Sequence, residues 1–303
     1  MKKISLIIPL YNDASRIGRC LDSVCSQTII DQVEVIIVDD GSTDDSIKVV
    51  NTTISKWERQ NQFILVSVSP NKGVANARRA GVKKSTGDYI MFCDSDDWME
   101  PQMCEAMLNQ AELFGNDLVV CDYYANYEDS TKETIIGYRE PYLKELLLWT
   151  ITGALWNKLI RKELLLQDRF IFPTSDFSED FVYSSQFGLF AQNIGYVNIP
   201  LYNYLHRSGS LVRSISSEKQ FKRLKDDIVN FNLVIEILRR EGVYGKFREE
   251  IIVHKWKIKN HYRSNNKLWR SVYPEINNDV FKSKYISLRS KVAYLSSLLL
   301  GYR

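Results

Sequence analysis

The chain has 303 residues, of which 45% are hydrophobic and 25% are charged, the balance of an ordinary globular protein. Its 40 basic and 37 acidic residues leave a net charge of +3, which is too even to indicate nucleic-acid binding. This length is enough for one large domain with an extension or for two modest domains. Composition therefore excludes a disordered or membrane-embedded chain but names no function.

The first ten residues contain a short apolar run that ends without a small-residue cleavage site. A buried first strand explains this run better than a signal peptide does, and no apolar run elsewhere reaches about 18 residues. We therefore expect a cytoplasmic protein. The cysteines are odd in number, form no Cys-x-x-Cys pair and are predicted to be reduced core residues: Cys20, Cys25, Cys93, Cys104 and Cys121.

Short runs rich in Ile and Val alternate with helix-length segments in the first half of the chain, which is a βαβ rhythm. The unbroken apolar run Val35–Val38 predicts a strand buried on both faces, as in a parallel sheet between helix layers. Strands are predicted at residues 4–9, 33–39, 63–67, 89–93 and 118–123. Helices are predicted between them at residues 17–24, 47–57 and 101–114.

From about Thr131 the pattern becomes mixed and aromatic, with a predicted helix at 180–190 and a predicted strand at 197–205. We expect this part to extend the same α/β domain. After Ser216 apolar residues recur at spacings of three and four, which predicts helices at 218–241 and, last, at 283–300. The predicted organisation is an α/β domain over residues 1–215 and a helical extension over residues 216–303.

Three polar clusters directly follow predicted strands: Pro9-Leu10-Tyr11-Asn12, Asp39-Asp40-Gly41-Ser42 and Asp94-Ser95-Asp96-Asp97. In a parallel α/β sheet, ligands bind outside the carboxyl ends of the strands. The topology therefore predicts that these clusters form one composite site.

The Asp94-x-Asp96 pair can place two carboxylates on one side of an extended chain. Hard oxygen ligands of this kind suit Mg²⁺ or Mn²⁺ held together with substrate phosphates. The alternative is a solvated acidic turn or a helix cap. Similarly, Asp40 can accept the N–H of a pyrimidine and Tyr11 can border it, or this segment is only a capped turn.

These motifs, together with Asn71-Lys72-Gly73-Val74-Ala75-Asn76-Ala77-Arg78 and Gly87-Asp88-Tyr89-Ile90, resemble the family 2 glycosyltransferases, whose fold is called GT-A. The resemblance implies that Pro9, Tyr11 and Asp40 line a nucleobase pocket. It further implies that Asp94 faces the ribose or phosphates and that Asp96 ligates the metal. Family members often have Ala-Arg-Asn at residues 77–79, so Arg79 is a departure. The predicted nucleotide-binding residues are Pro9, Tyr11, Asn12, Asp40, Lys72, Arg78, Asp94, Ser95 and Arg207.

Farther along, Trp156-Asn157-Lys158-Leu159 and Ser178-Glu179-Asp180-Phe181 are similar to segments of bacterial members that build surface polysaccharides. Asp180, with Glu179 as the second candidate, is the predicted general base; the alternative is first-turn charge that complements the helix dipole. Tyr202–Ser210 resembles an aromatic and basic loop in which Arg207 is predicted to contact the leaving diphosphate. His206 is better explained as a polar residue at a strand end.

The final segment combines basic residues with leucines, and it either lies on an anionic membrane surface or packs as a helix on the protein. It contains Lys282, Lys284, Arg289, Lys291, Leu295, Leu298, Leu299 and Leu300. A lipid-linked acceptor would make peripheral attachment at the inner face of the plasma membrane useful.

The predicted reaction is inverting, metal-dependent transfer of a sugar from a nucleotide diphosphate donor, of the UDP-sugar class, to a hydroxyl of a saccharide or lipid-linked acceptor. Two alternatives stay open. A noncatalytic nucleotide-sugar-binding protein would keep Tyr11, Asp40 and Asp96 but would not need Asp180. A sugar nucleotidyltransferase should carry a Gly-rich phosphate loop near the N-terminus, where Pro9–Asn12 supplies none.

Overall fold

A computed structural model describes residues 2–127, 129–206, 217–262 and 266–300. Its strands are β1 (Ile4–Leu10), β2 (Val33–Asp39), β3 (Phe63–Ser67), β4 (Tyr89–Phe92), β5 (Trp98–Met99), β6 (Leu118–Tyr127), β7 (Lys132–Ile135), β8 (Lys158–Arg161) and β9 (Ile194–His206). Its α-helices are α1 (Ile17–Cys25), α2 (Ser46–Lys56), α3 (Val74–Lys84), α4 (Met103–Phe114), α5 (Tyr142–Leu147), α6 (Lys162–Leu166), α7 (Glu179–Phe190), α8 (Ser217–Arg240), α9 (Arg248–His261), α10 (Asn266–Ser271), α11 (Asp279–Lys282) and α12 (Leu288–Leu300).

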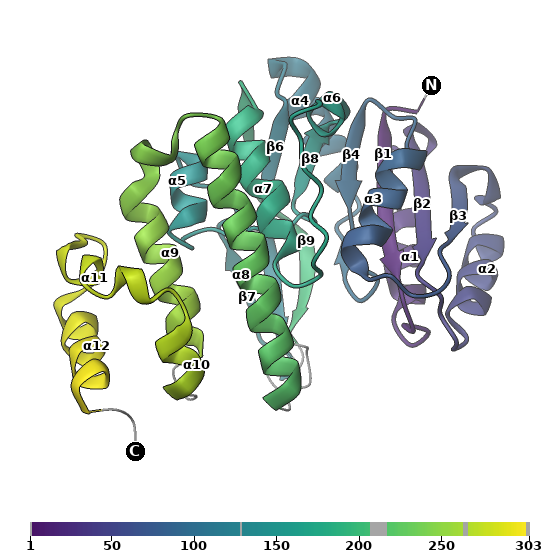
Figure 1. The fold of residues 1–303 in the computed structure, drawn as a ribbon. Helices are drawn as coiled ribbons and strands as arrows, with labels where there is room; N and C mark the ends of the chain where they lie inside the picture. The colour runs from purple at the N-terminus through teal and green to yellow at the C-terminus, as the bar shows by residue number, and fades with distance from the viewer. Residues whose placement is uncertain (1, 128, 207–216, 263–265, 301–303) are drawn as a thin grey trace. The chain divides into compact units, whose positions relative to one another are not determined.

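The strands form one sheet in the order β3-β2-β1-β4-β8-β6-β9-β5, with β7 paired to β6 (Figure 1). β1 pairs in parallel with β2 and β4, and β2 pairs in parallel with β3. β8 then runs antiparallel between β4 and β6, and β9 returns parallel to β6. The α/β fold predicted from the sequence is confirmed. The sheet is parallel in its N-terminal half and mixed as a whole. The antiparallel strands β5, β7 and β8 were not predicted, because they are short and give no clear sequence pattern.

Helices cover both faces of the N-terminal half of the sheet, as the apolar run in β2 predicts. On one face, even-numbered side chains of β1 join residues of α1, α2 and α4 in a single hydrophobic core. On the other face α3 packs so closely that a side chain at Gly81 would lie 2.4 Å from Ile7. Phe92, the partner of Ile7 in the ladder, meets Tyr183 of α7 on this same face. On this second face, α3 and α7 therefore pack against the neighbouring strands β1 and β4.

The chain divides into two compact units, and residues 139–152 group with the C-terminal helices from residue 216 onward. Within this second unit, His254 of α9 is buried and accepts the indole N–H of Trp149. It also lies 3.0 Å from the carbonyl oxygen of Leu147, and burial lowers its pKa to about 3. A neutral imidazole therefore anchors the 139–152 segment. The predicted boundary at residue 215 stays a prediction.

All five cysteines are free and buried, which confirms the sequence-based prediction of reduced core residues. None of the helices in the described ranges combines the length and hydropathy needed to cross a bilayer.

Candidate active site

The ends of β1 and β2 and the loop after β3 are tied together by the backbone and the side chain of Asp40. The Asp40 N–H donates to the carbonyl oxygen of Leu10 at 2.9 Å. The two carboxylate oxygens of Asp40 accept the N–H groups of Lys72 and Gly73, at 2.9 and 2.7 Å. Asp40 is buried, so its charge depends on these donors. Each carboxylate oxygen still has a second lone pair with which to accept an N–H from a ligand.

Tyr11 and Asn12 leave the end of β1 beside this loop. Tyr11 is 51% exposed, so its ring is accessible to a ligand. Asn12 adopts a positive φ of 48° and its side-chain oxygen accepts the N–H of Thr43 at 2.7 Å. Its own N–H donates to Ser42 Oγ at 3.0 Å. Asn12 thus joins the β1 and β2 loops, and the half-buried Pro9 lies within β1 two residues before the exposed ring.

The acidic turn 94–97 directly follows β4 and is held from behind by β9. The hydroxyl of Tyr202 accepts the Asp94 N–H at 3.1 Å and donates to Asp97 Oδ2 at 2.9 Å. The N–H of Leu205 donates to the other oxygen of Asp97 at 2.8 Å. Burial raises the pKa of Asp97 well above its usual range, and the charges of Asp96 and Asp94 raise it further. Asp97 is therefore a structural anchor that keeps Asp94 and Asp96 at the surface of the turn.

Ser95 connects the acidic turn to the first loop of the fold. Its Oγ donates to Asp13 Oδ2 at 2.6 Å, and Asp13 also forms an ion pair with Arg16. Asp13 is buried, and its N–H donates to Ser46 Oγ at 2.8 Å. The motifs quoted from the sequence did not include Asp13, because no spacing rule relates it to residue 95. The predicted nucleotide-binding residues of the first and third clusters are thus brought together.

The acidic turn fits a small divalent cation shared with a phosphate ligand. Asp94 and Asp96 are both partly exposed and offer hard carboxylate oxygens. No group of three or more His, Cys, Asp or Glu side chains suited to a metal occurs among the described residues. Two carboxylates are what Mg²⁺ commonly uses when substrate phosphates and waters complete its coordination shell.

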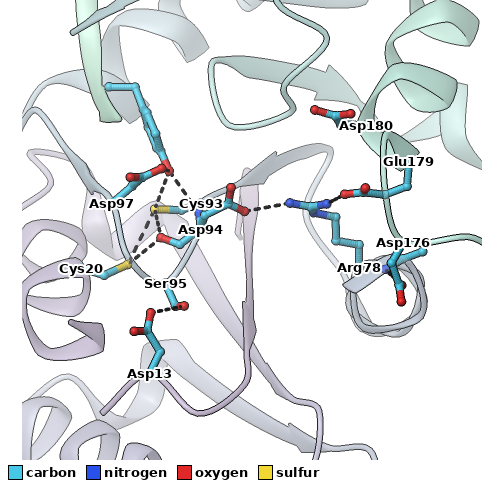
Figure 2. A network of polar contacts seen from close by, with 12 residues as sticks. Asp13, Cys20, Arg78, Cys93, Asp94, Ser95, Asp97, Asp176, Glu179 and Asp180 are labelled. Carbon is cyan, nitrogen blue, oxygen red and sulfur yellow. Dashed lines mark hydrogen bonds and ion pairs between the residues drawn. The ribbon is translucent and has the colours of Figure 1, made fainter. Parts of the chain in front are cut away.

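Arg78 of α3 bridges the acidic turn and the start of α7, as Figure 2 shows. Its Nη2 lies 2.8 Å from Asp94 Oδ1, and its Nη1 forms an ion pair with Glu179 Oε1. The guanidinium and Glu179 are buried, so both depend on this pairing. The bridge brings the predicted catalytic pair Glu179 and Asp180 to the edge of the sheet that carries Asp94.

Asp180 follows Glu179 in the first turn of α7, where its Oδ1 accepts the N–H of Phe181 at 2.7 Å. Burial raises the pKa of the Asp180 carboxyl, an effect that Arg78, the Phe181 N–H and Lys158 partly offset. Lys158 of β8 is completely buried, and its Nζ donates to the Ala154 carbonyl and to Asn157 Oδ1. Burial lowers the pKa of Lys158 to about 7, against the opposing charge of Asp180. A carboxylate with a raised pKa is a stronger proton acceptor than an ordinary aspartate.

Asp176 is a site residue that sequence reasoning missed. Its Oδ1 accepts the N–H of Ala75, at 3.3 Å, in the first turn of α3. Gly73 precedes this turn with a φ of 91°, and a Cβ there would lie 2.1 Å from both carboxylate oxygens of Asp176. Only glycine fits this position, which explains the Asn-x-Gly pattern before α3. No sequence signal links Asp176 to a loop a hundred residues earlier.

The remaining predicted nucleotide-binding residues are Lys72 and Arg207. The side chain of Lys72 is exposed next to the backbone N–H that binds Asp40. His206, at the end of β9, stacks on Tyr127 with ring centroids 4.6 Å apart, consistent with a residue at a strand end. Arg207 lies outside the described residues.

The comparisons with known proteins identify the family of the chain and its fold. A Bacillus subtilis (strain 168) protein that bears the name glycosyltransferase EpsH is 32% identical over 260 residues, which cover 82% of this chain and 72% of that protein. The fold is similar to that of Staphylococcus aureus TarS, residues 1–349, in complex with UDP-GlcNAc, with a TM-score of 0.62, 16% identity and coverage of 99% and 93%.

A second solved structure, the mannosyltransferase PcManGT from Pyrobaculum calidifontis in complex with GDP-Man and Mn²⁺, has a TM-score of 0.59, 14% identity and coverage of 99% and 88%. These likenesses confirm the predicted GT-A-like fold. The sequence profile described as glycosyl transferase family 2 matches residues 5–167 and so includes the acidic turn, Arg78 and Asp40. Together with the identity to EpsH, this match shows that the chain belongs to glycosyl transferase family 2.

Proposed function

We propose that this glycosyltransferase transfers the sugar of a UDP-sugar to an acceptor hydroxyl, in one displacement that inverts the anomeric centre. The observation that carries the proposal is the Arg78 bridge, because it joins the acidic turn to the helix that bears Asp180. One half of such a site holds a nucleotide and its diphosphate, and the other supplies a carboxylate for the acceptor. A protein that only binds a nucleotide-sugar has no need of the second half.

In this proposal the nucleobase lies against Tyr11, between Pro9 and Asp40. The exposed Tyr11 ring supplies a flat apolar surface, and Asp40 supplies a fixed carboxylate that can accept a base N–H. The complex of TarS with UDP-GlcNAc supports a uridine nucleotide as the donor. Asn12, Lys72 and Ser95 are further nucleotide contacts in the same proposal, which their backbone or side-chain links to the three loops support.

Asp96, assisted by Asp94, would hold Mn²⁺ or Mg²⁺ at the diphosphate. The presence of Mn²⁺ with GDP-Man in PcManGT supports this assignment, as does the pair of partly exposed carboxylates in the acidic turn. When bound, such a cation neutralises negative charge that develops on the leaving diphosphate. Arg78 adds a fixed positive charge at the same edge and orients Asp94 through its ion pair.

Asp180 accepts the proton of the acceptor hydroxyl as the acceptor oxygen bonds to the anomeric carbon and the nucleoside diphosphate departs. Its raised pKa suits this task, since burial makes the carboxylate more basic. The positive charges of Arg78 and Lys158 favour its ionised form and so limit this rise. One base and one displacement give a product of inverted configuration. Glu179 is committed to the ion pair with Arg78, so it is the less suitable base.

The acceptor in this proposal is a saccharide or lipid-linked saccharide at the cytoplasmic face of the plasma membrane, and the product belongs to a polysaccharide or glycoconjugate. The similarity of Trp156–Leu159 and Ser178–Phe181 to bacterial surface-polysaccharide enzymes supports this class of product.

The test is turnover of Asp180→Asn beside Glu179→Gln, with the exposed Asp168→Asn as the matched control. A panel of nucleotide-sugars, with and without Mn²⁺, first identifies the donor by thermal stabilisation. We expect kcat of Asp180→Asn to fall by about 10² to 10⁴ with little change in donor affinity. NMR of the product should show inverted anomeric configuration. Near-normal turnover in Asp180→Asn, or a retained configuration, would contradict the assigned base or the single displacement.

A further inference from the structure

The last helix, α12, presents an apolar stripe to solvent on the face opposite to the one by which it packs. Leu288, Val292 and Leu295 are 77%, 56% and 44% exposed. Their spacing of four and then three residues places them along one line of the helix. Three neighbouring exposed aliphatic side chains differ from the single exposed residues found on most surfaces.

The opposite face of α12 packs within its own unit, so the helix is not simply detached. Tyr294 is buried against Trp269, with ring centroids 5.4 Å apart, and its hydroxyl donates to Asn277 Oδ1 at 2.6 Å. Ser297, one turn later on the same side, is also buried. The sequence left two alternatives for this segment, packing on the protein or adsorption to a membrane. The helix packs by one face and exposes apolar residues on the other, so the two are compatible.

The charges around the stripe are basic. Arg289 is exposed and Lys291 is partly exposed, and their positions on the helix flank the line of Leu288, Val292 and Leu295. From Val280 to Arg303 the sequence contains Lys and Arg but no Asp or Glu. The nearby acids belong to other elements: Glu249 of α9 pairs with Lys284 at 3.6 Å, and Asp279 starts α11. Neither lies on α12 itself.

We infer that α12 is a membrane-docking helix that lies in the surface of an anionic bilayer. An apolar stripe flanked by basic residues is the pattern of interfacial helices, in which the apolar side chains enter the acyl boundary and the cations stay among the headgroups. The basic flanks favour anionic lipid over a neutral apolar partner. This inference deepens the proposed function, because it names the surface through which the enzyme would reach a lipid-linked acceptor.

The experiment is co-sedimentation of the full chain with phosphatidylcholine vesicles, with and without an equal part of phosphatidylglycerol, in the absence of donor and acceptor. The variant Leu288→Ser/Val292→Ser/Leu295→Ser should lose about tenfold or more in partition onto the anionic vesicles. Arg289→Gln/Lys291→Gln should lose about thirtyfold on the same vesicles, from roughly 1 kcal/mol for each of the two cations, and change little on neutral ones. Leu113→Ser is the matched control, since Leu113 is 76% exposed on α4, and it should bind as the unaltered chain does.

For each variant, sedimentation velocity gives the oligomeric state and thermal unfolding shows whether the protein is folded. Wild-type vesicle binding by the folded triple variant would overturn the inference. If the unaltered chain is dimeric and the triple variant is monomeric but still binds vesicles, the stripe is instead a contact with a second copy of the chain. Turnover with a water-soluble acceptor is expected to stay unchanged in the triple variant, so failure of docking and failure of the proposed transfer reaction are separate results.

Discussion

Replacing Arg78 with Met tests whether the bridge between the acidic turn and α7 stabilises the site. The substitution keeps an unbranched side chain but removes the charge that faces Asp94 and Glu179. Breaking a buried pair costs about 3–5 kcal/mol, because a charge is left without compensation. Glu179 is 8% exposed whereas Asp94 is 29% exposed and partly solvated, so the lower end, about 3 kcal/mol, is expected.

This loss corresponds to a decrease in Tm of roughly 6–12 °C, since 1 kcal/mol shifts Tm by about 2–4 °C in a domain of this size. The assay is thermal unfolding without nucleotide or metal. Arg79→Met is the matched control, because Arg79 is the exposed neighbour on α3, and it should change Tm by only a few degrees. Adding Glu179→Gln to Arg78→Met should recover about 1–2 kcal/mol, because the stranded carboxylate is then neutral. Strictly additive losses in the double variant would refute the coupling.

Two further predictions concern the metal and the base. Asp96→Asn should weaken Mn²⁺-dependent binding of UDP by about tenfold or more, because a charged contact worth about 1.5–3 kcal/mol is lost. Calorimetry measures this affinity. The same affinity and the same metal dependence in the variant would remove Asp96 from the metal site. The rate at subsaturating acceptor should fall as the pH is lowered through the pKa of Asp180, because the base must be ionised. Since burial raises this pKa, the fall should occur at a pH above the usual aspartate pKa of about 3.9. A pH–rate profile that stays flat down to that range would exclude a base of raised pKa.

Much of the N-terminal half was predictable because its strands are unbroken apolar runs. The predicted strands at 4–9, 33–39 and 63–67 agree closely with β1, β2 and β3, and the helix predicted at 180–190 agrees with α7. α3 was not predicted as a helix, because its buried face has one sizeable apolar residue, Val82, beside Ala75, Ala77, Arg78 and Gly81. The strand order was also beyond reach, because β8 is only four residues long and its place between β4 and β6 depends on tertiary packing.

For the site, motif and resemblance named the individual residues, and topology predicted that the strand ends would converge. What the sequence did not reveal were the partners that hold those residues. Asp40 is fixed by backbone N–H groups, Arg78 by two carboxylates, and the acidic turn by the hydroxyl of Tyr202. Such contacts join segments that lie far apart in the chain, and no local pattern of residue types specifies them.

The place of β8 in the sheet has a consequence for the synthesis of this protein. β4 is an interior strand, yet the neighbour on its outer side begins only at Lys158. While the ribosome is still adding the residues between them, β1 to β4 can pair in parallel, but β4 offers an open edge of N–H and C=O groups. Open edges pair readily with other chains. The nascent first third of the molecule therefore exposes a strand edge that the finished sheet covers with β8.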